Sequence, residues 1–267
     1  MSAIKPMYDV AATKVIDSCY YILAKDPEPM PENYAFFNNP GFIVTSVGVV
    51  VDTGSSVQIG EMVLRQIKKA TDQPVIMVIN THYHGDHFLG NHDFVEAYPQ
   101  ADIYSHPAMI QNIKSGGGDF WLSFMQRNSD DGISGTIISL LNKTLNGGEV
   151  LKVGDTAMRR VANMVDGSFP GTIEVMKKAQ ALRCDHYIVG HALHDNASVC
   201  KDMQSFCENI YDSAVIYCEE GLSDFEMKPK ILAQPFMKDV ASHWPGFDKT
   251  VGVFIATAVA EVEENMC

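Results

Sequence analysis

The chain has 267 residues, with 33 Asp and Glu against 20 Lys and Arg, so its formal net charge is −13. Such an excess of negative charge repels the phosphates of DNA and RNA, and we expect no nucleic-acid partner. Hydrophobic residues make up 46% of the chain and charged residues 20%, a balance typical of globular proteins. The longest apolar runs fall short of the ~20 residues that a membrane helix needs, so we also expect no membrane partner.

The start of the chain shows no apolar core of a signal peptide. We therefore expect a cytoplasmic protein, or a periplasmic or secreted one if a signal peptide has been removed. The six cysteines form no CxxC pair and have no regular spacing, which indicates buried thiols rather than disulfides or zinc knuckles.

The first part of the chain alternates short apolar runs with polar turns, which predicts an α/β arrangement. Ser55 and Ser56 can cap a helix that runs to about residue 69. The apolar run over 75–79 is continuous, as in strands buried on both faces, and leads directly into a polar loop. Strands are expected at residues 15–23, 42–45, 47–51, 75–79 and 101–105.

The rest of the chain becomes increasingly helical. Residues 107–146 are mostly helical in pattern, and short strands are expected at 149–153 and 186–189. We expect an α/β domain over 1–195 and a helical C-terminal extension over 196–267, packed on the same domain. Helices are expected at residues 172–182, 199–219, 224–232 and 250–264.

The most informative segment is His82-Tyr83-His84-Gly85-Asp86-His87, which follows the strand at 75–79. His82 and His84 lie two apart on an extended segment, so they point to the same side and can bind one metal ion. Asp86 and His87 lie on the following turn, where they can face a second metal ion. Imidazole and carboxylate ligands without thiolates suit Zn²⁺, with Fe or Mn less favoured. A solvated loop with chance histidines explains the pattern poorly, because four of the nine histidines fall within eleven residues.

This motif, with Asn80-Thr81 before it and Gly90-Asn91 after it, resembles the metal-binding signature of the metallo-β-lactamase superfamily. The resemblance implies a four-layer αβ/βα sandwich, with the metal site at one edge between two sheets. The upstream strand that ends at Asp52-Thr53-Gly54 resembles the family's aspartate turn. Asp52 is then expected to support the metal-binding loop through hydrogen bonds without binding metal itself.

Two further ligands follow from the same resemblance. Ile188-Val189-Gly190-His191 is similar to the segment that carries the family's last histidine ligand, and His194 is expected beside the ligands or on the surface. Gly154-Asp155 is similar to the turn whose carboxylate bridges two metal ions, although Gly-Asp-Thr is also typical of an ordinary turn. The implied metal ligands are His82, His84, Asp86, His87, Asp155 and His191.

The sequence departs from the family pattern at one ligand, because no histidine lies between 107 and 185. Two explanations stay open. Either the site is depleted and Asp155 serves with five other ligands, or a segment of the second sheet is absent and 151–155 leads into the missing piece. In both cases His82 and His84 lack the family's third ligand, and we expect the sheet to be short of strands near 139–155.

The resemblance implies a hydrolase that uses one or two zinc ions. A metal-activated hydroxide would attack the carbonyl of a small ester, thioester, lactone or β-lactam, with Asp86 as a metal ligand that also orients the nucleophile. The expected partner is a small-molecule substrate, and a homo-oligomer stays open. The alternative is a degenerate member of the fold that binds metal weakly and is weakly active or non-catalytic.

Overall fold

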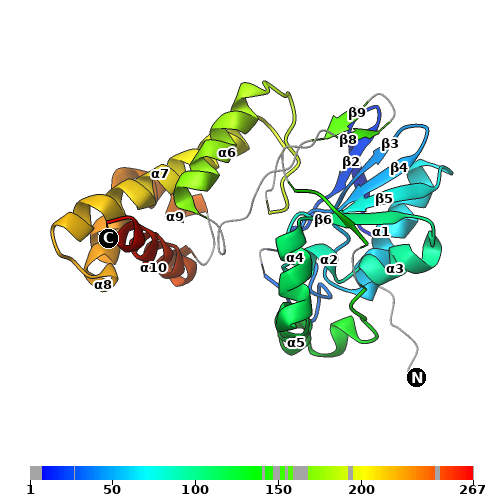
Figure 1. Ribbon diagram of the computed structural model, residues 1–267, viewed down its shortest axis with the longest axis horizontal. Coiled ribbons are helices and arrows are strands. Elements are labelled where there is room, and N and C mark those ends of the chain that lie inside the picture. Colours follow the sequence, from blue (N-terminus) through cyan, green and yellow to red (C-terminus); the bar gives the residue numbers. More distant parts are fainter. Residues whose placement is uncertain are drawn as a thin grey trace. The chain divides into compact units, whose positions relative to one another are not determined.

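The computed structural model describes residues 8–26, 28–139, 142–146, 151–153, 156–158, 168–191, 195–243 and 247–266. The chain forms two compact units (Figure 1). The first, here called the sheet unit, takes in Met1–Arg160 and Ile188–Asp195. The second, the helical unit, takes in Val161–Tyr187 and Asn196–Cys267.

The sheet unit is built on a mixed sheet whose strands follow one another in chain order. The first four strands pair antiparallel, and each later strand pairs parallel with the one before it. Within the described residues this sheet has seven strands: β1 (Ala12–Ile16), β2 (Cys19–Ile22), β3 (Gly41–Val44), β4 (Gly48–Val51), β5 (Val75–Ile79), β6 (Asp102–Ser105) and β7 (Lys143–Thr144). A separate antiparallel pair is formed by β8 (Leu151–Val153) and β9 (Thr156–Met158).

Helix α1 (Val57–Ala70) begins where the sequence predicts, because the Ser56 side chain accepts a hydrogen bond from the backbone N–H of Ile59. Its apolar side chains recur at helical spacing, and Ile59, Met62 and Ile67 are fully buried. They join the main core together with residues from the other helices of this unit. Those are α2 (Gly85–Phe88), α3 (Asn91–Ala97), α4 (Pro107–Asn112), α5 (Gly118–Ser129) and the π-helical turn Ile113–Gly117 between the last two.

Both faces of the central parallel strands are buried. Successive side chains of a strand point to opposite faces. Val50 and Val78 belong to the core beneath the helices, whereas Val49 and Ile79 belong to a smaller apolar cluster with Ile43. This explains why β5 reads as an uninterrupted apolar run in the sequence.

The helical unit contains α6 (Phe169–Ala181), α7 (Ser198–Glu219), α8 (Asp224–Leu232), α9 (Pro235–His243) and α10 (Phe247–Met266). Its core is an apolar cluster that includes Phe206, Ile210, Met227, Val251 and Ile255. None of the helices in the described part of the chain is long and apolar enough to cross a membrane.

The sequence predicts a division of the chain into residues 1–195 and 196–267. The two units of the structure divide the chain at other residues. Helix α6 groups with the helical unit because it packs along α7 (Figure 1). The Gln180 side chain donates a 2.7 Å hydrogen bond to Gln204, and Lys177 pairs with Glu208 at 3.0 Å. The expected docking of the helical extension on the α/β domain stays a prediction.

Two of the predicted strands differ in the structure. Residues 15–23 form the hairpin β1–β2 rather than one strand, with a turn at Asp17 and Ser18. Residues 186–189 form no strand apart from an isolated bridge between His186 and Asn196. The backbone carbonyl of Val189 in this segment instead accepts a 3.0 Å hydrogen bond from the Asn39 side chain.

Candidate metal centre

The site begins where two neighbouring parallel strands end. Val51 of β4 lies opposite Ile79 of β5, so the residues that follow the two strands lie at the same edge of the sheet. Asp52 takes a left-handed backbone conformation with φ of 58°, which Asp tolerates better than most residues. Its backbone N–H donates to Ile79 O at 2.9 Å. This geometry directs the Asp52 side chain towards the loop after β5.

The Asp52 carboxylate is 4% exposed and accepts three hydrogen bonds. Oδ1 accepts from the backbone N–H of Thr81 at 2.8 Å. Oδ2 accepts from the Thr81 hydroxyl at 2.9 Å and from Nδ1 of His87 at 2.8 Å. Asp52 therefore holds the loop that carries the histidine motif through Thr81 and His87, and its expected effect on a metal stays a prediction.

A buried amide network fixes the other end of the loop. The side chains of Asn80 and Asn91 exchange hydrogen bonds of 2.8 and 3.1 Å, and Thr53 donates to Asn91 at 2.8 Å. Asn80 also donates to the backbone carbonyl of His87 at 2.9 Å. The sequence alone predicts no separate role for these three residues. The only signal was their position beside the histidine motif.

Glycine at position 90 is required for this arrangement. A Cβ at Gly90 would lie 2.3 Å from the carbonyl oxygen of Thr53 and 3.2 Å from the Cα of Gly60. Any larger residue would push the start of α3 away from α1 and from the turn after β4. The close approach of these backbones keeps Asn91 within reach of Asn80.

Three potential ligand atoms converge above this network. Asp86 Oδ2 lies 2.7 Å from His87 Nε2 and 3.2 Å from His191 Nε2, and the two imidazole nitrogens are 3.3 Å apart. Asp86, His87 and His191 form the group of possible metal ligands that stands out among the described residues. The side chains of Asp86 and His87 are 3% exposed and that of His191 is 49% exposed, so the group opens to solvent on the His191 side.

Hydrogen bonds fix which imidazole nitrogen faces the centre of the group. Nδ1 of His87 donates to Asp52, and Nδ1 of His191 donates to the backbone carbonyl of Phe37 at 3.0 Å. A carboxylate and a carbonyl can only accept, so both Nδ1 atoms carry hydrogen and both Nε2 atoms point inwards. Metal-binding histidines usually have this second partner at the other ring nitrogen.

The electrostatics of the group favour a cation. Burial favours the neutral form of Asp86, but His87 and His191 hold the pKa of its carboxyl well below the usual range. Burial also opposes a charge on His87, yet Asp86 and Asp52 raise its pKa to about 10. Without metal, the buried carboxylates are therefore balanced by a protonated imidazole. A metal ion that binds Nε2 displaces this proton and takes over its charge.

The spacing of the three atoms fits a zinc ion. Tetrahedral ligands at ~2.0–2.1 Å from zinc lie ~3.3 Å from one another. The observed separations of 2.7, 3.2 and 3.3 Å need only a small adjustment to reach this geometry. The donor set of one carboxylate and two imidazoles is one that zinc accepts.

His82 and His84 lie next to this group. The His82 ring centroid is 4.0 Å from that of His87 and 4.6 Å from that of His84. Thr81 donates its hydroxyl hydrogen to Asp52, so its oxygen accepts from Nδ1 of His82 at 3.0 Å. Nε2 of His82 is buried and has no hydrogen-bond partner among the described residues. Burial, followed by the neighbouring His87 and His84, lowers the pKa of His82 to about 2, so this nitrogen presents a lone pair.

The other predicted residues cannot be placed. Asp155 and His194 lie outside the described residues. That Asp155 bridges two metal ions stays a prediction. Within the described residues, no third histidine, cysteine or carboxylate completes a group around His82 and His84.

Comparison with known proteins matches part of the chain to a family. Residues 35–158 match the family model of the metallo-beta-lactamase superfamily. A curated relative, the linear primary-alkylsulfatase of Pseudomonas sp. (strain ATCC 19151), is 32% identical over 73 residues. That match covers 26% of this chain and only 14% of the alkylsulfatase, so the chain corresponds to a small part of that protein.

Solved structures show the same fold. The inverting sec-alkylsulfatase Pisa1 from Pseudomonas sp. matches with a TM-score of 0.60 at 13% identity, over 96% of this chain and 50% of that chain. A metallo-beta-lactamase from Hirschia baltica matches with a TM-score of 0.54 at 12% identity, over 75% of this chain and 98% of that chain. The expected fold class, with its helical C-terminal part, is confirmed. Residues 35–158 therefore form a domain of the metallo-β-lactamase superfamily.

Proposed function

We propose that the chain is a zinc-dependent hydrolase whose metal ion is bound by Asp86, His87 and His191. The observation that carries this proposal is the convergence of their three ligand atoms within 3.3 Å, with both imidazoles oriented by hydrogen bonds at Nδ1. The superfamily to which the domain belongs includes hydrolases, and the relatives named above are a β-lactamase and two alkylsulfatases.

When bound, zinc supplies a Lewis acid and lowers the pKa of water from about 15.7 to about 7. The residues of the chain provide the rest. Asp86 is a ligand whose second carboxylate oxygen can orient the attacking water. His82 presents a neutral nitrogen beside His87, either as a hydrogen-bond acceptor or, together with His84, as a ligand for a second ion.

The proposed substrate is a small molecule with an ester-type bond. The candidates are a carboxylic ester, thioester, lactone or β-lactam, and the names of the two alkylsulfatases add a sulfate ester. The half-exposed His191 leaves one side of the group open for such a molecule. Hydrolysis of each of these bonds needs attack by water, at the carbonyl carbon of the carboxylic compounds and at the sulfur or carbon of a sulfate ester.

The test combines metal content with activity. The purified chain is loaded with zinc, dialysed and analysed for metal, and is then assayed against one compound of each class. We expect at least one zinc per chain and hydrolysis of at least one compound, both lost in Asp86→Ala. The absence of a histidine between 107 and 185 motivates the alternative, a non-catalytic relative. Weak zinc binding together with hydrolysis of none of the compounds would favour that alternative.

A further inference from the structure

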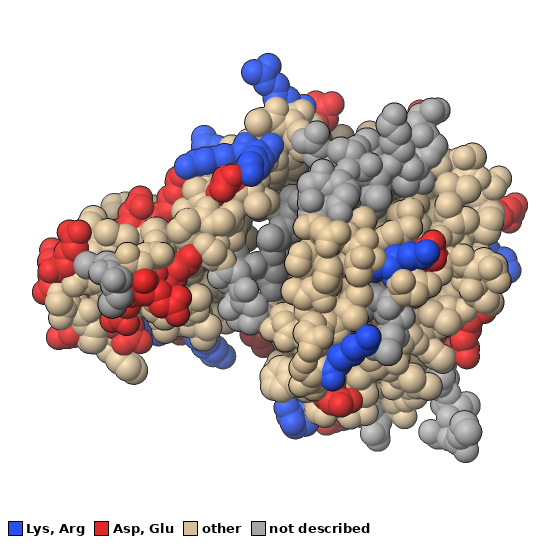
Figure 2. All heavy atoms as spheres, in the orientation of Figure 1, with Lys and Arg blue, Asp and Glu red and all other residues tan. Residues whose placement is uncertain are grey.

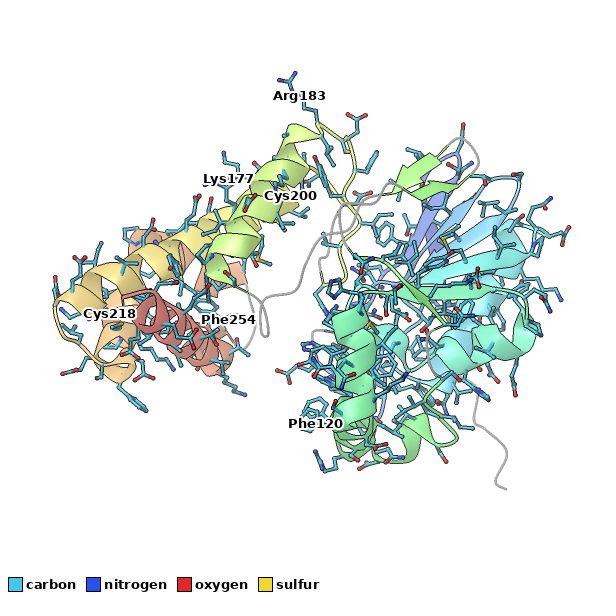
Figure 3. All side chains as sticks on the ribbon, in the orientation of Figure 1. Phe120, Lys177, Arg183, Cys200, Cys218 and Phe254 are labelled. Atoms are coloured by element: carbon cyan, nitrogen blue, oxygen red, sulfur yellow. The ribbon has the colours of Figure 1, made fainter. Side chains whose placement is uncertain are left out.

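Helix α5 carries three aromatic side chains, here called the aromatic cluster: Phe120, Trp121 and Phe124. Their ring centroids lie 5.4 to 6.4 Å apart, so they form one continuous apolar surface. The Phe120 side chain is 56% exposed, and Figure 3 shows it at the outer side of α5. Figure 2 shows mostly uncharged surface over α4 and α5, in contrast to the many acidic side chains on the helical unit.

The aromatic cluster is continuous with the metal centre. The Trp121 ring centroid lies 4.4 Å from that of His84. His84 lies beside His82, which in turn lies beside His87. Glycine at position 85 leaves room for this contact, because a Cβ there would lie 3.0 Å from the Cβ of Trp121 and would require a small shift of α5. An unbroken row of rings therefore leads from α5 to the proposed metal ligands.

Trp121 also has an unsatisfied polar atom. Its indole Nε1 is buried and has no hydrogen-bond partner among the described residues. Buried tryptophan N–H groups usually find a partner, and the described residues supply none here. The cluster thus combines an exposed ring, that of Phe120, with a half-buried ring, that of Trp121, beside the candidate metal centre.

We propose that the aromatic cluster binds the hydrocarbon group of the substrate. Trp121 contacts the part nearest the reacting bond, whereas Phe120 contacts the distal part of the chain. The proposal rests on the proposed hydrolase function and deepens it. The preferred substrate carries a linear alkyl or acyl chain of several carbons and not a compact polar group.

The expected effect follows from the hydrophobic contribution of a methylene group. Full burial of one CH₂ strengthens binding about fourfold, and a half-exposed surface such as that of Phe120 contributes less. From the acetyl to the octanoyl ester of one alcohol, kcat/KM should therefore rise at least about tenfold. The octanoyl-to-acetyl ratio of kcat/KM measures the subsite directly, because the reacting bond is the same in both esters.

The test uses the zinc-loaded full chain with p-nitrophenyl esters from acetate to octanoate. Phe120→Ala should lower the octanoyl-to-acetyl ratio about fivefold, whereas Trp121→Phe keeps an aromatic ring beside His84 and should keep the preference for long chains. The matched control is Phe225→Ala in α8, since Phe225 is 84% exposed in the helical unit and should leave the ratio unchanged. A wild-type ratio near one, or the same ratio in Phe120→Ala as in the wild type, would overturn the proposal.

A binding measurement separates this proposal from the proposed function. Octyl sulfonate and ethyl sulfonate are not hydrolysed, and calorimetry reports their binding without any reaction. If no ester is hydrolysed but octyl sulfonate binds tighter than ethyl sulfonate, and Phe120→Ala removes the difference, the hydrolase fails and the subsite stands. If esters are hydrolysed but the two sulfonates bind alike, the subsite fails and the hydrolase stands.

Discussion

Replacing Asp52 by Asn tests how the loop that carries His87 is held. Asn keeps the size of the side chain and tolerates the left-handed backbone conformation at this position, where φ is 58°. It replaces one acceptor oxygen by a donor NH₂ group. If the amide nitrogen faces His87, it meets the Nδ1–H that Asp52 now accepts at 2.8 Å; if the amide is turned over, it meets the backbone N–H of Thr81.

Either orientation leaves one pair of donors facing each other in a buried site. His87 can relieve the first clash only by moving its hydrogen to Nε2, which removes the lone pair that a metal needs. Loss of a partner of this kind typically weakens metal affinity ~10–100-fold, which corresponds to ~1.4–2.7 kcal/mol. We expect a loss of this size for Asp52→Asn.

The zinc dissociation constant is measured by competition with a chromophoric chelator at pH 7. The matched control is Asp93→Asn, because the Asp93 carboxyl is also buried but packs against Gly60 of α1. Burial, with repulsion from Glu61 and Glu96, raises the pKa of Asp93 to about 8, so at pH 7 it is already neutral, like an amide. Equal zinc affinity in the wild type and in Asp52→Asn would refute the role assigned to Asp52.

Three further predictions follow from single contacts. His191→Ala removes a ligand held by the Phe37 carbonyl, and metal analysis after dialysis should find well under one zinc per chain; full occupancy would contradict the assignment. The raised pKa of Asp93 means that the folded chain holds this proton up to about pH 8 and the unfolded chain only to about pH 4, so stability falls as pH rises through this range. Asp93→Asn should therefore raise the melting temperature at pH 8 but not at pH 4, and equal shifts at both pH values would argue against a neutral Asp93. Ser56→Ala removes the cap of α1 and should cost ~1 kcal/mol in urea unfolding, whereas an unchanged midpoint would show that the cap contributes nothing.

The sequence predicts the elements whose side chains are buried in a simple pattern. The bounds of β5 follow from an apolar run with both faces covered, and the start of α1 follows from Ser56. The hairpin β1–β2 is missed because its turn at Asp17 and Ser18 contains neither Gly nor Pro. The sequence does not predict α9 as a separate helix, because Pro235 and Pro245 interrupt the helical pattern.

The sequence predicts the parts of the candidate site that depend on the type of side chain, and not those that depend on backbone groups or on packing. The histidine motif marks the loop, and the resemblance to the family brings in His191 from more than 100 residues away. The groups that orient these ligands include the backbone carbonyl of Phe37, and any residue type can supply a carbonyl. The contact of Trp121 with His84 depends on how α5 packs against the loop, which no local pattern reveals.

The most direct test of the metal centre is an anomalous difference map at the zinc absorption edge from crystals of the zinc-loaded chain. We predict a peak ~2.0–2.2 Å from Asp86 Oδ2, His87 Nε2 and His191 Nε2, with Asp52 in contact with His87 and not with the metal. A zinc peak that lies away from His191, or a map with no peak near Asp86 and His87, would contradict it.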